Sequence, residues 1–180
     1  MSQTKFIFDS DSLIIAKGIH YSPSFCAAFW DWVITGHQNG NFFLIDKVAD
    51  ELKKGYERDF LREFVERNED GLVLHSKNDH SCLLKYAQVQ QWAVSVWANG
   101  KPPSKVAKAL EIFANEKIAD PWLVSYASAY GYTIITNESS APSSQTSVKL
   151  PDAAHALGVK TARLHEVLQL HSGNNFSFKS

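Results

Sequence analysis

Acidic side chains recur where short apolar segments of the chain end. Residues 5–8, 42–45 and 132–135 are each short, apolar and bounded by polar residues, which is typical of buried strands. An acid follows each of these segments, and a fourth acid opens the helix that leads into the last of them. In open α/β sheets, ligands bind beyond the carboxyl ends of the strands, so these side chains could meet at one place. The four residues are Asp9, Glu51, Asp120 and Glu138.

If these carboxylates meet, they need a counter-charge. Two like charges ~4 Å apart repel by about 4 kcal/mol at an effective dielectric constant near 20. A divalent cation removes this conflict, and an all-oxygen ligand set favours Mg²⁺ or Mn²⁺. Zinc is disfavoured, because the sequence has no HExxH pair and His75, His80 and Cys82 supply at most three ligands. Carboxylate-bound Mg²⁺ can activate water for phosphodiester cleavage, which predicts nuclease chemistry.

Each acid also has a purely structural alternative. Asp120 stands before Pro121, as a helix N-cap does. Glu51, expected in the first turns of its helix, could complement the helix dipole. Asp9 and Asp11 could form a turn, and Glu138 could be a solvated loop residue. The grouping of the four at strand ends is what favours a shared site.

The order of the predicted elements indicates an α/β fold. Apolar strands alternate with helices, so we expect a three-layer α/β/α arrangement around a central, mainly parallel sheet of about four to five strands. Residues 159–162 predict a last short strand, and residues 72–74 predict either a short strand or an extended connection. The mostly helical stretch at about 56–117 is expected to be an elaboration on one side of the sheet. We predict a single domain over 1–172 and a flexible tail over 173–180.

Three segments carry more detailed expectations. Ser22-Pro23 predicts the start of a helix that ends at Asn39-Gly40. The small, polar residues 139–148 predict a mobile loop. A long helix is expected from 79 to about 97. The predicted inward side chains of the two helices are Phe25, Phe29, Trp32 and Val33 in the first, and Leu83, Leu84, Ala87, Val94 and Trp97 in the second.

Composition points to a globular protein of the cytoplasm. Of 180 residues, 44% are hydrophobic, which excludes a disordered chain. The two cysteines, Cys26 and Cys82, form no recognisable disulfide framework, and no apolar run approaches the length of a membrane span. The polar start Met1 to Lys5 is unlike a signal peptide. The net charge of −1 gives no reason to expect non-specific binding to nucleic acid, so any such contact must be local.

The four motifs, taken in order, resemble the PIN-domain ribonucleases. They are Phe6-Ile7-Phe8-Asp9-Ser10-Asp11, Val48-Ala49-Asp50-Glu51-Leu52, Ala119-Asp120-Pro121-Trp122-Leu123-Val124 and Ile134-Ile135-Thr136-Asn137-Glu138. The chain is most similar to the PIN-like group with a long helical middle, which is often regarded as the toxin half of bacterial toxin–antitoxin pairs. The resemblance extends from Lys5 to about Leu168.

This resemblance implies a hydrolase, namely a metal-dependent endoribonuclease using Mg²⁺ or Mn²⁺. Its catalytic and metal-binding acids map onto Asp9, Glu51, Asp120 and Glu138. The family more often has Asp at the last position, so Glu138 is a departure from its pattern. Asp11 and Thr136 match supporting positions, and Asp152 is a possible neighbour. A cognate antitoxin and a homodimer are also implied as partners.

RNA requires positive charge beside the acids. Residues 71–119 carry 6 Lys against 3 acids, a local excess of three positive charges. Trp92 or Trp97 could stack on a base, although exposed lysines and helical tryptophans more often have no such role. The candidate phosphate contacts are Lys53, Lys54, Lys101, Lys105, Lys108 and Lys149.

Two other functions fit parts of the pattern. Asp9-Ser10-Asp11 after a strand resembles the paired aspartates of haloacid-dehalogenase-like phosphatases, with Asp9 as nucleophile and Asp11 as acid/base. Against it, Leu13 stands where Thr or Val is usual. The third possibility is an inactive PIN-like module that binds RNA or a partner. Metal-dependent cleavage would separate these cases.

Overall fold

The computed structural model describes residues 4–54 and 59–179. Five short strands form one parallel sheet in the order β3-β2-β1-β4-β5. The strands are β1 (Phe6–Phe8), β2 (Phe42–Ile45), β3 (Val73–Leu74), β4 (Thr133–Ile135) and β5 (Thr161–Ala162). The predicted α/β class with a central parallel sheet is confirmed. Residues 1–3, 55–58 and 180 lie outside the described residues, and they include the start of the predicted domain and the start of the predicted helical elaboration.

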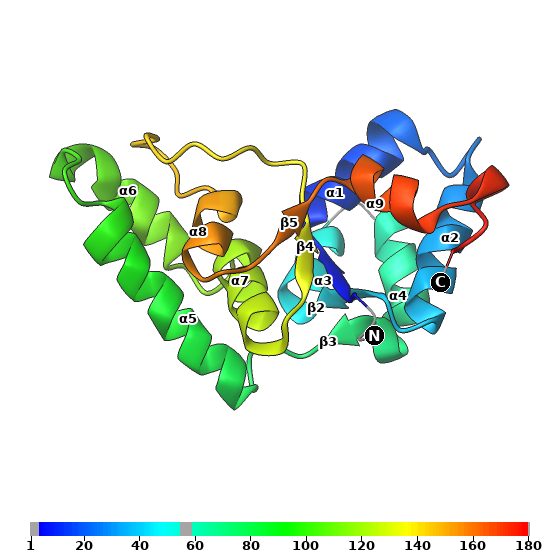
Figure 1. Ribbon diagram of the computed structural model, residues 1–180, viewed down its shortest axis with the longest axis horizontal. Helices are drawn as coiled ribbons and strands as arrows, with labels where there is room; N and C mark the ends of the chain where they lie inside the picture. Colours follow the sequence, from blue (N-terminus) through cyan, green and yellow to red (C-terminus); the bar gives the residue numbers. More distant parts are fainter. Residues whose placement is uncertain (1–3, 55–58, 180) are drawn as a thin grey trace.

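Helices cover both faces of this sheet. Figure 1 shows α5, α7 and α8 on one side and α2, α4 and α9 on the other. The helices are α1 (Ser10–Ile15), the π-helix η1 (Ala16–His20), α2 (Ala27–Gln38), α3 (Asp46–Leu52), α4 (Phe60–Leu72), α5 (His80–Trp92), the π-helix η2 (Ala93–Trp97), α6 (Pro103–Phe113), α7 (Ala119–Tyr130), α8 (Leu150–Ala156), α9 (Leu164–His171) and the short 3₁₀ turn η3 (Asn174–Phe176). No helix among them is long and apolar enough to cross a membrane.

The parallel register explains which residues end up side by side at the edge of the sheet. Phe8 of β1 pairs with Ile135 of β4, and Ile7 pairs with Phe43 of β2. All three residues of β1 and of β4 are buried, because helices cover the sheet on both sides. Asp9 and Thr136 are the next residues after the Phe8–Ile135 pair. The pairing of β1 with β4 therefore places these two polar side chains next to each other.

An aromatic cluster joins α2 to the sheet and to the C-terminal segment. The ring centroids of Trp32 and Phe42 lie 4.7 Å apart, and those of Phe42 and Phe178 lie 5.6 Å apart. Ser172 forms an antiparallel bridge with Phe178. Residues 173–179, where the sequence predicts a flexible tail, are thus packed through Phe178. The predicted domain limits remain a prediction.

Two helices differ from their predictions: one begins later in the chain, and the other buries a different face. The helix expected from Ser22-Pro23 begins only at Ala27, because the one-turn segment after Ser22 ends at Cys26, whose φ of −134° is not helical. Phe25 is consequently 73% exposed rather than buried. In α5 and η2, the predicted inward positions Leu83, Leu84, Ala87 and Val94 are exposed, and Trp97 is buried. The inward face of α5 instead contains Cys82 and Val89, which are fully buried.

Candidate active site

Asp9 and Thr136 meet at the carboxyl ends of β1 and β4. The Asp9 amide donates to the Ile135 carbonyl at 2.9 Å, continuing the strand pairing by one residue. Thr136 Oγ1 donates to Asp9 Oδ2 at 2.8 Å. Asp9 is only 6% exposed and Thr136 only 2%. One Asp9 oxygen is therefore fixed by the neighbouring strand.

Glu51 connects the starts of two other helices. Its Oε2 accepts a hydrogen bond from Ser10 Oγ at 2.7 Å, and its Oε1 accepts one from the Ala119 amide at 3.2 Å. Ser10 follows Asp9 and Ala119 precedes Asp120, so Glu51 lies between the two aspartates. Glu51 is in the last turn of α3, where the helix dipole disfavours an acid. Glu51 therefore does not complement the start of its own helix, and contacts the start of α7 instead. Ser10 was not singled out from sequence, because its partner is 41 residues away.

Asp120 lies inside the first turn of α7. The helix begins at Ala119, and its N-cap residue is Ile118, which makes no side-chain capping bond. Asp120 is partly buried, and its carboxylate accepts no hydrogen bond from the described residues. The capping alternative is therefore wrong for this residue. A half-buried carboxylate without hydrogen-bond partners is costly unless a cation or a proton neutralises it.

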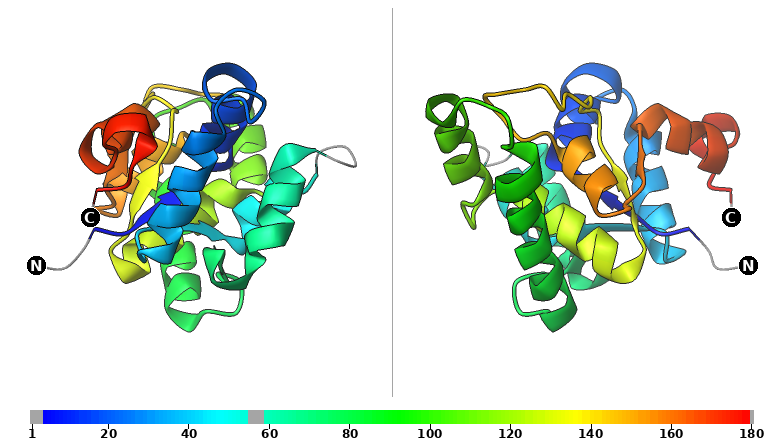
Figure 2. Two further views of the ribbon diagram at one scale, coloured as in Figure 1. Left: turned by 90° about the vertical axis from the view of Figure 1, so that its right-hand side faces the viewer. Right: turned by 60° about the vertical axis from the view of Figure 1, so that its left-hand side comes forward.

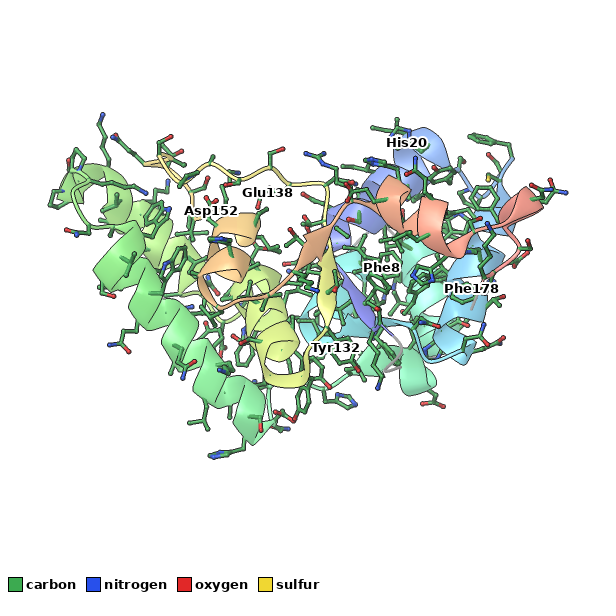
Figure 3. All side chains as sticks on the ribbon, viewed as in Figure 1. Phe8, His20, Tyr132, Glu138, Asp152 and Phe178 are labelled. Atoms are coloured by element: carbon green, nitrogen blue, oxygen red, sulfur yellow. The ribbon has the colours of Figure 1, made fainter. Side chains whose placement is uncertain are left out.

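Glu138 is bound to the start of α8. Its amide donates to Thr136 Oγ1 at 3.1 Å. Its Oε1 accepts from Lys149 Nζ and its Oε2 from the Leu150 amide, both at 2.7 Å. Figure 3 labels the Glu138 side chain above α8 in that view. Glu138 is thus an anchored residue and not a freely solvated loop residue.

The acids interact strongly with one another. Burial raises the pKa of Asp9 to about 6, opposed by the Thr136 hydrogen bond and reinforced by the charges of Asp11, Glu51 and Glu138. Burial raises the pKa of Asp120 to about 8, again reinforced by neighbouring acids. Those neighbours are Asp9, Glu138, Glu51 and Asp11. The fold has gathered acids from four separate segments into one negative region.

The acid cluster has the oxygen donors that a divalent cation prefers, but its side chains as placed do not form a complete coordination site. Among residues 4–54 and 59–179, no three His, Cys, Asp or Glu side chains are close enough together to hold a metal ion as placed. The hydrogen bonds explain this, since Glu51 and Glu138 both use each of their oxygens within the protein. Asp9 and Asp120 remain with raised pKa values, and a doubly charged ion would relieve their repulsion. The oxygen-only donor set suits Mg²⁺ or Mn²⁺.

The two predicted supporting acids lie in different surroundings. Asp11 is exposed on α1, and its charge raises the pKa of both Asp9 and Asp120. Asp152 is buried at the start of α8, where it accepts hydrogen bonds from Ser140 Oγ and from the Ala141 amide. Asp152 therefore holds the segment that follows Glu138. That segment runs from β4 to the tip of the α5–α6 pair before it returns to α8 (Figure 2).

Of the predicted basic residues, the structure brings Lys149 to the acids. Lys53 instead pairs with Glu69 of α4 at 2.8 Å. Lys101 Nζ lies 3.7 Å from the centre of the Trp97 ring, in a buried position. Lys54, Lys105 and Lys108 are exposed. Trp97 is only 4% exposed and its ring face is covered by Lys101, so it is a core residue, as helical tryptophans more often are, and does not offer its ring to a base. Trp92 is partly buried.

Comparisons with known proteins agree with this architecture. Residues 6–174 match the family described as a domain of unknown function (DUF4411). No curated protein matches the sequence.

Two solved structures share the fold. One is the crystal structure of DNA-bound VapBC from Salmonella typhimurium, at 13% identity and a TM-score of 0.51, with 89% of this chain and 98% of that chain covered. The other is VapBC2 from Rickettsia felis bound to a promoter DNA fragment, at 11% identity and a TM-score of 0.54, with the same coverage. The five-stranded parallel sheet flanked by helices matches the PIN-like fold of these neighbours.

Proposed function

The chain belongs to the DUF4411 family, and from its PIN-like fold and its acid cluster we propose that it is a metal-dependent endoribonuclease. The observation that carries the proposal is the meeting of Asp9, Glu51, Asp120 and Glu138 from four distant segments. N-capping does not explain Asp120, which lies inside the first turn of α7. A site that concentrates negative charge in this way is suited to a divalent cation.

Asp9 and Asp120 would hold Mg²⁺ or Mn²⁺, with Glu51 and Glu138 as further ligands, directly or through water. The bound ion would activate a water molecule and stabilise the leaving oxygen of the phosphodiester. The protein's own groups prepare the site. The Thr136 hydrogen bond favours the ionised form of Asp9, and Ser10 orients Glu51. Lys149 compensates the charge of Glu138.

We further propose that the protein is the toxin of a toxin–antitoxin pair in the cytoplasm. The fold likeness to VapBC structures supports this role and an antitoxin as partner. A homodimer is proposed on the family resemblance alone. The phosphatase alternative with Asp9 and Asp11 gains no support from the PIN-like fold, and Asp11 is exposed on α1. An inactive binding module remains the alternative that an activity assay must address.

The test is cleavage of a mixed RNA pool by the purified full chain. We expect cleavage with Mg²⁺ or Mn²⁺, none with EDTA, and none with Asp9→Asn or Asp120→Asn. Asp31→Asn is the matched control, because Asp31 is an exposed acid on α2 outside the cluster, and it should cut at the parent rate. Thermal unfolding must show that the inactive variants are folded. Parent-rate cleavage by either cluster variant would exclude the assigned site.

Growth provides the test of the toxin role. Expression of the parent chain should arrest growth, and Asp9→Asn should relieve the arrest. An active ribonuclease that leaves growth unaffected would argue against the toxin role and leave the enzyme proposal standing.

A further inference from the structure

A cavity lies beside the segment of chain that carries Thr136 and Glu138. It has a volume of about 460 Å³ and opens between η1 and the start of α9. Asn137, which lies between Thr136 and Glu138 in the chain, forms part of its wall. The opposite wall belongs to η1, which continues the helix that starts directly after Asp9. Each wall is therefore built from a segment of chain that also carries an acid of the cluster. Figure 3 shows His20 at the outer end of this region.

The cavity is basic, in contrast to the cluster beside it. Arg163, His20 and His165 line it, and no Asp or Glu is among its described lining residues. Arg163 Nη2 donates to Ser139 Oγ at 3.1 Å, which points the guanidinium toward the segment that carries Glu138. That bond uses one of the five donors of the side chain. An arginine in this setting is suited to a phosphate group.

Apolar surface completes the lining. Ile15 and Tyr21 form part of the wall, and the Tyr21 ring is held by stacking on Phe29 with centroids 4.5 Å apart. A ligand with an anionic group and a flat ring would match both kinds of surface. RNA offers this combination at every nucleotide.

We propose that this Arg163 cavity binds a nucleotide of the RNA substrate next to the phosphodiester that is cut. The inference rests on the proposed ribonuclease function. The phosphate of the nucleotide contacts Arg163 and the two histidines, and its ring lies against Ile15 and Tyr21. Such a contact offsets the repulsion between RNA and the carboxylates, which otherwise disfavours a polyanion at this edge of the sheet.

The test is the binding of a short single-stranded RNA in EDTA, measured by fluorescence anisotropy at several salt concentrations. EDTA keeps the RNA intact and separates binding from cleavage. Arg163→Gln should raise the Kd about tenfold, the effect expected for one charge-assisted hydrogen bond. It should also reduce the slope of log K against log salt by about 0.7. Arg163→Lys keeps the charge and should retain most of the salt dependence.

Arg67→Gln is the matched control, because Arg67 is exposed on α4, pairs with Glu63 and does not line the cavity. It should leave the Kd unchanged. A second measurement does not depend on any variant: the imidazole NMR signals of His20 and His165 in the parent chain should shift when RNA is added.

The outcomes separate this inference from the proposed function. RNA binding that Arg163→Gln does not weaken, with unshifted His20 and His165 signals, overturns the inference even if the enzyme cuts RNA through Asp9. Binding that needs Arg163, in a protein that cuts no RNA with Mn²⁺, refutes the nuclease and leaves the cavity as an RNA-binding site only. Absence of RNA binding in EDTA refutes the inference, and Mn²⁺-dependent cleavage then decides the proposed function separately.

Discussion

Thr136 Oγ1 donates a hydrogen bond to Asp9 Oδ2 across 127 residues of sequence, and both side chains are buried. The Thr136 hydrogen bond opposes the rise in the Asp9 pKa. Burial and three neighbouring acids all favour the protonated form of Asp9. Thr136 is thus placed to keep a candidate metal ligand ionised near neutral pH.

Replacing Thr136 should therefore move the pH dependence of activity. In Thr136→Val the Asp9 pKa rises above about 6, so the acidic limb of the RNA cleavage profile should move up by about one pH unit, equivalent to ~1.4 kcal/mol. Thr136→Ser keeps the donor and should restore the parent profile. The measurement is the cleavage rate from pH 5 to pH 9 at saturating Mn²⁺. An unchanged profile in the valine variant would mean that this hydrogen bond does not tune Asp9.

Asp120 should make the metal-free protein less stable as the pH rises. The pKa values of Asp9 and Asp120 are about 6 and about 8 in the fold, against 3.8 ordinarily. The folded chain holds these protons more tightly than the unfolded chain. The resulting stabilisation is complete below about pH 4 and is lost as the pH rises through about 6 and then 8. In EDTA, the free energy of unfolding should therefore fall over this range.

The same argument predicts that Asp120→Asn is more stable than the parent in EDTA at pH 8. The expected gain is about 1 kcal/mol, or roughly 2–4 °C in Tm. Added Mn²⁺ should raise the Tm of the parent and not that of the variant, because a ligand stabilises only a fold that binds it. Scanning calorimetry in both buffers provides the measurement. A variant less stable than the parent in EDTA would show that Asp120 has a structural partner.

Lys149 should weaken cation binding at the cluster. Its Nζ pairs with Glu138, and the charges of Asp120 and Asp152 also raise its pKa. Lys149→Met removes this positive charge and should tighten Mn²⁺ binding about fivefold, corresponding to ~1 kcal/mol of lost repulsion. Lys160→Met, at an exposed lysine outside the cluster, should have no effect. Titration calorimetry measures both, and weaker binding in Lys149→Met would assign the lysine a role in holding the site open.

A substitution at Gly36 tests how tightly α2 packs against Phe42 and Phe178. A Cβ added there would clash with the Phe42 ring and lie 2.8 Å from Phe178 Cε2. Gly36→Ala should therefore lower the free energy of unfolding by about 1–3 kcal/mol. Gly18→Ala, whose Cβ meets nothing within 4 Å, is the control and should change stability little. Urea unfolding compares the two, and equal stabilities would exclude tight packing at this position.

The sequence predicted the strands better than the segments between them. The strand at 42–45 is found with the predicted bounds, and the one at 132–135 begins a single residue later. Apolar runs that are buried on both faces leave a clear local signal. The acids at the strand ends could be located for the same reason, because their positions follow from where the runs stop.

The turn predicted after β1 shows where local signals fail. Residues 9–12 look polar enough for a loop, yet α1 begins at Ser10. Ser12 Oγ donates to the Ile135 carbonyl at 3.1 Å, and Ser10 Oγ donates to Glu51. These partners are 123 and 41 residues away, so no nearby residue reveals them. The basic lining of the Arg163 cavity was missed similarly, since Arg163 and His20 come from opposite ends of the chain.

Because β1 pairs with β4, the acid cluster can form only after β4 has been synthesised. During synthesis, Asp9 leaves the ribosome more than a hundred residues before its partner strand and Thr136. Until then the carboxylate of Asp9 lacks the neighbours that hold it. A nascent chain still attached to the ribosome, surrounded by ribosomal and messenger RNA, therefore carries an unassembled site until Thr136 has emerged.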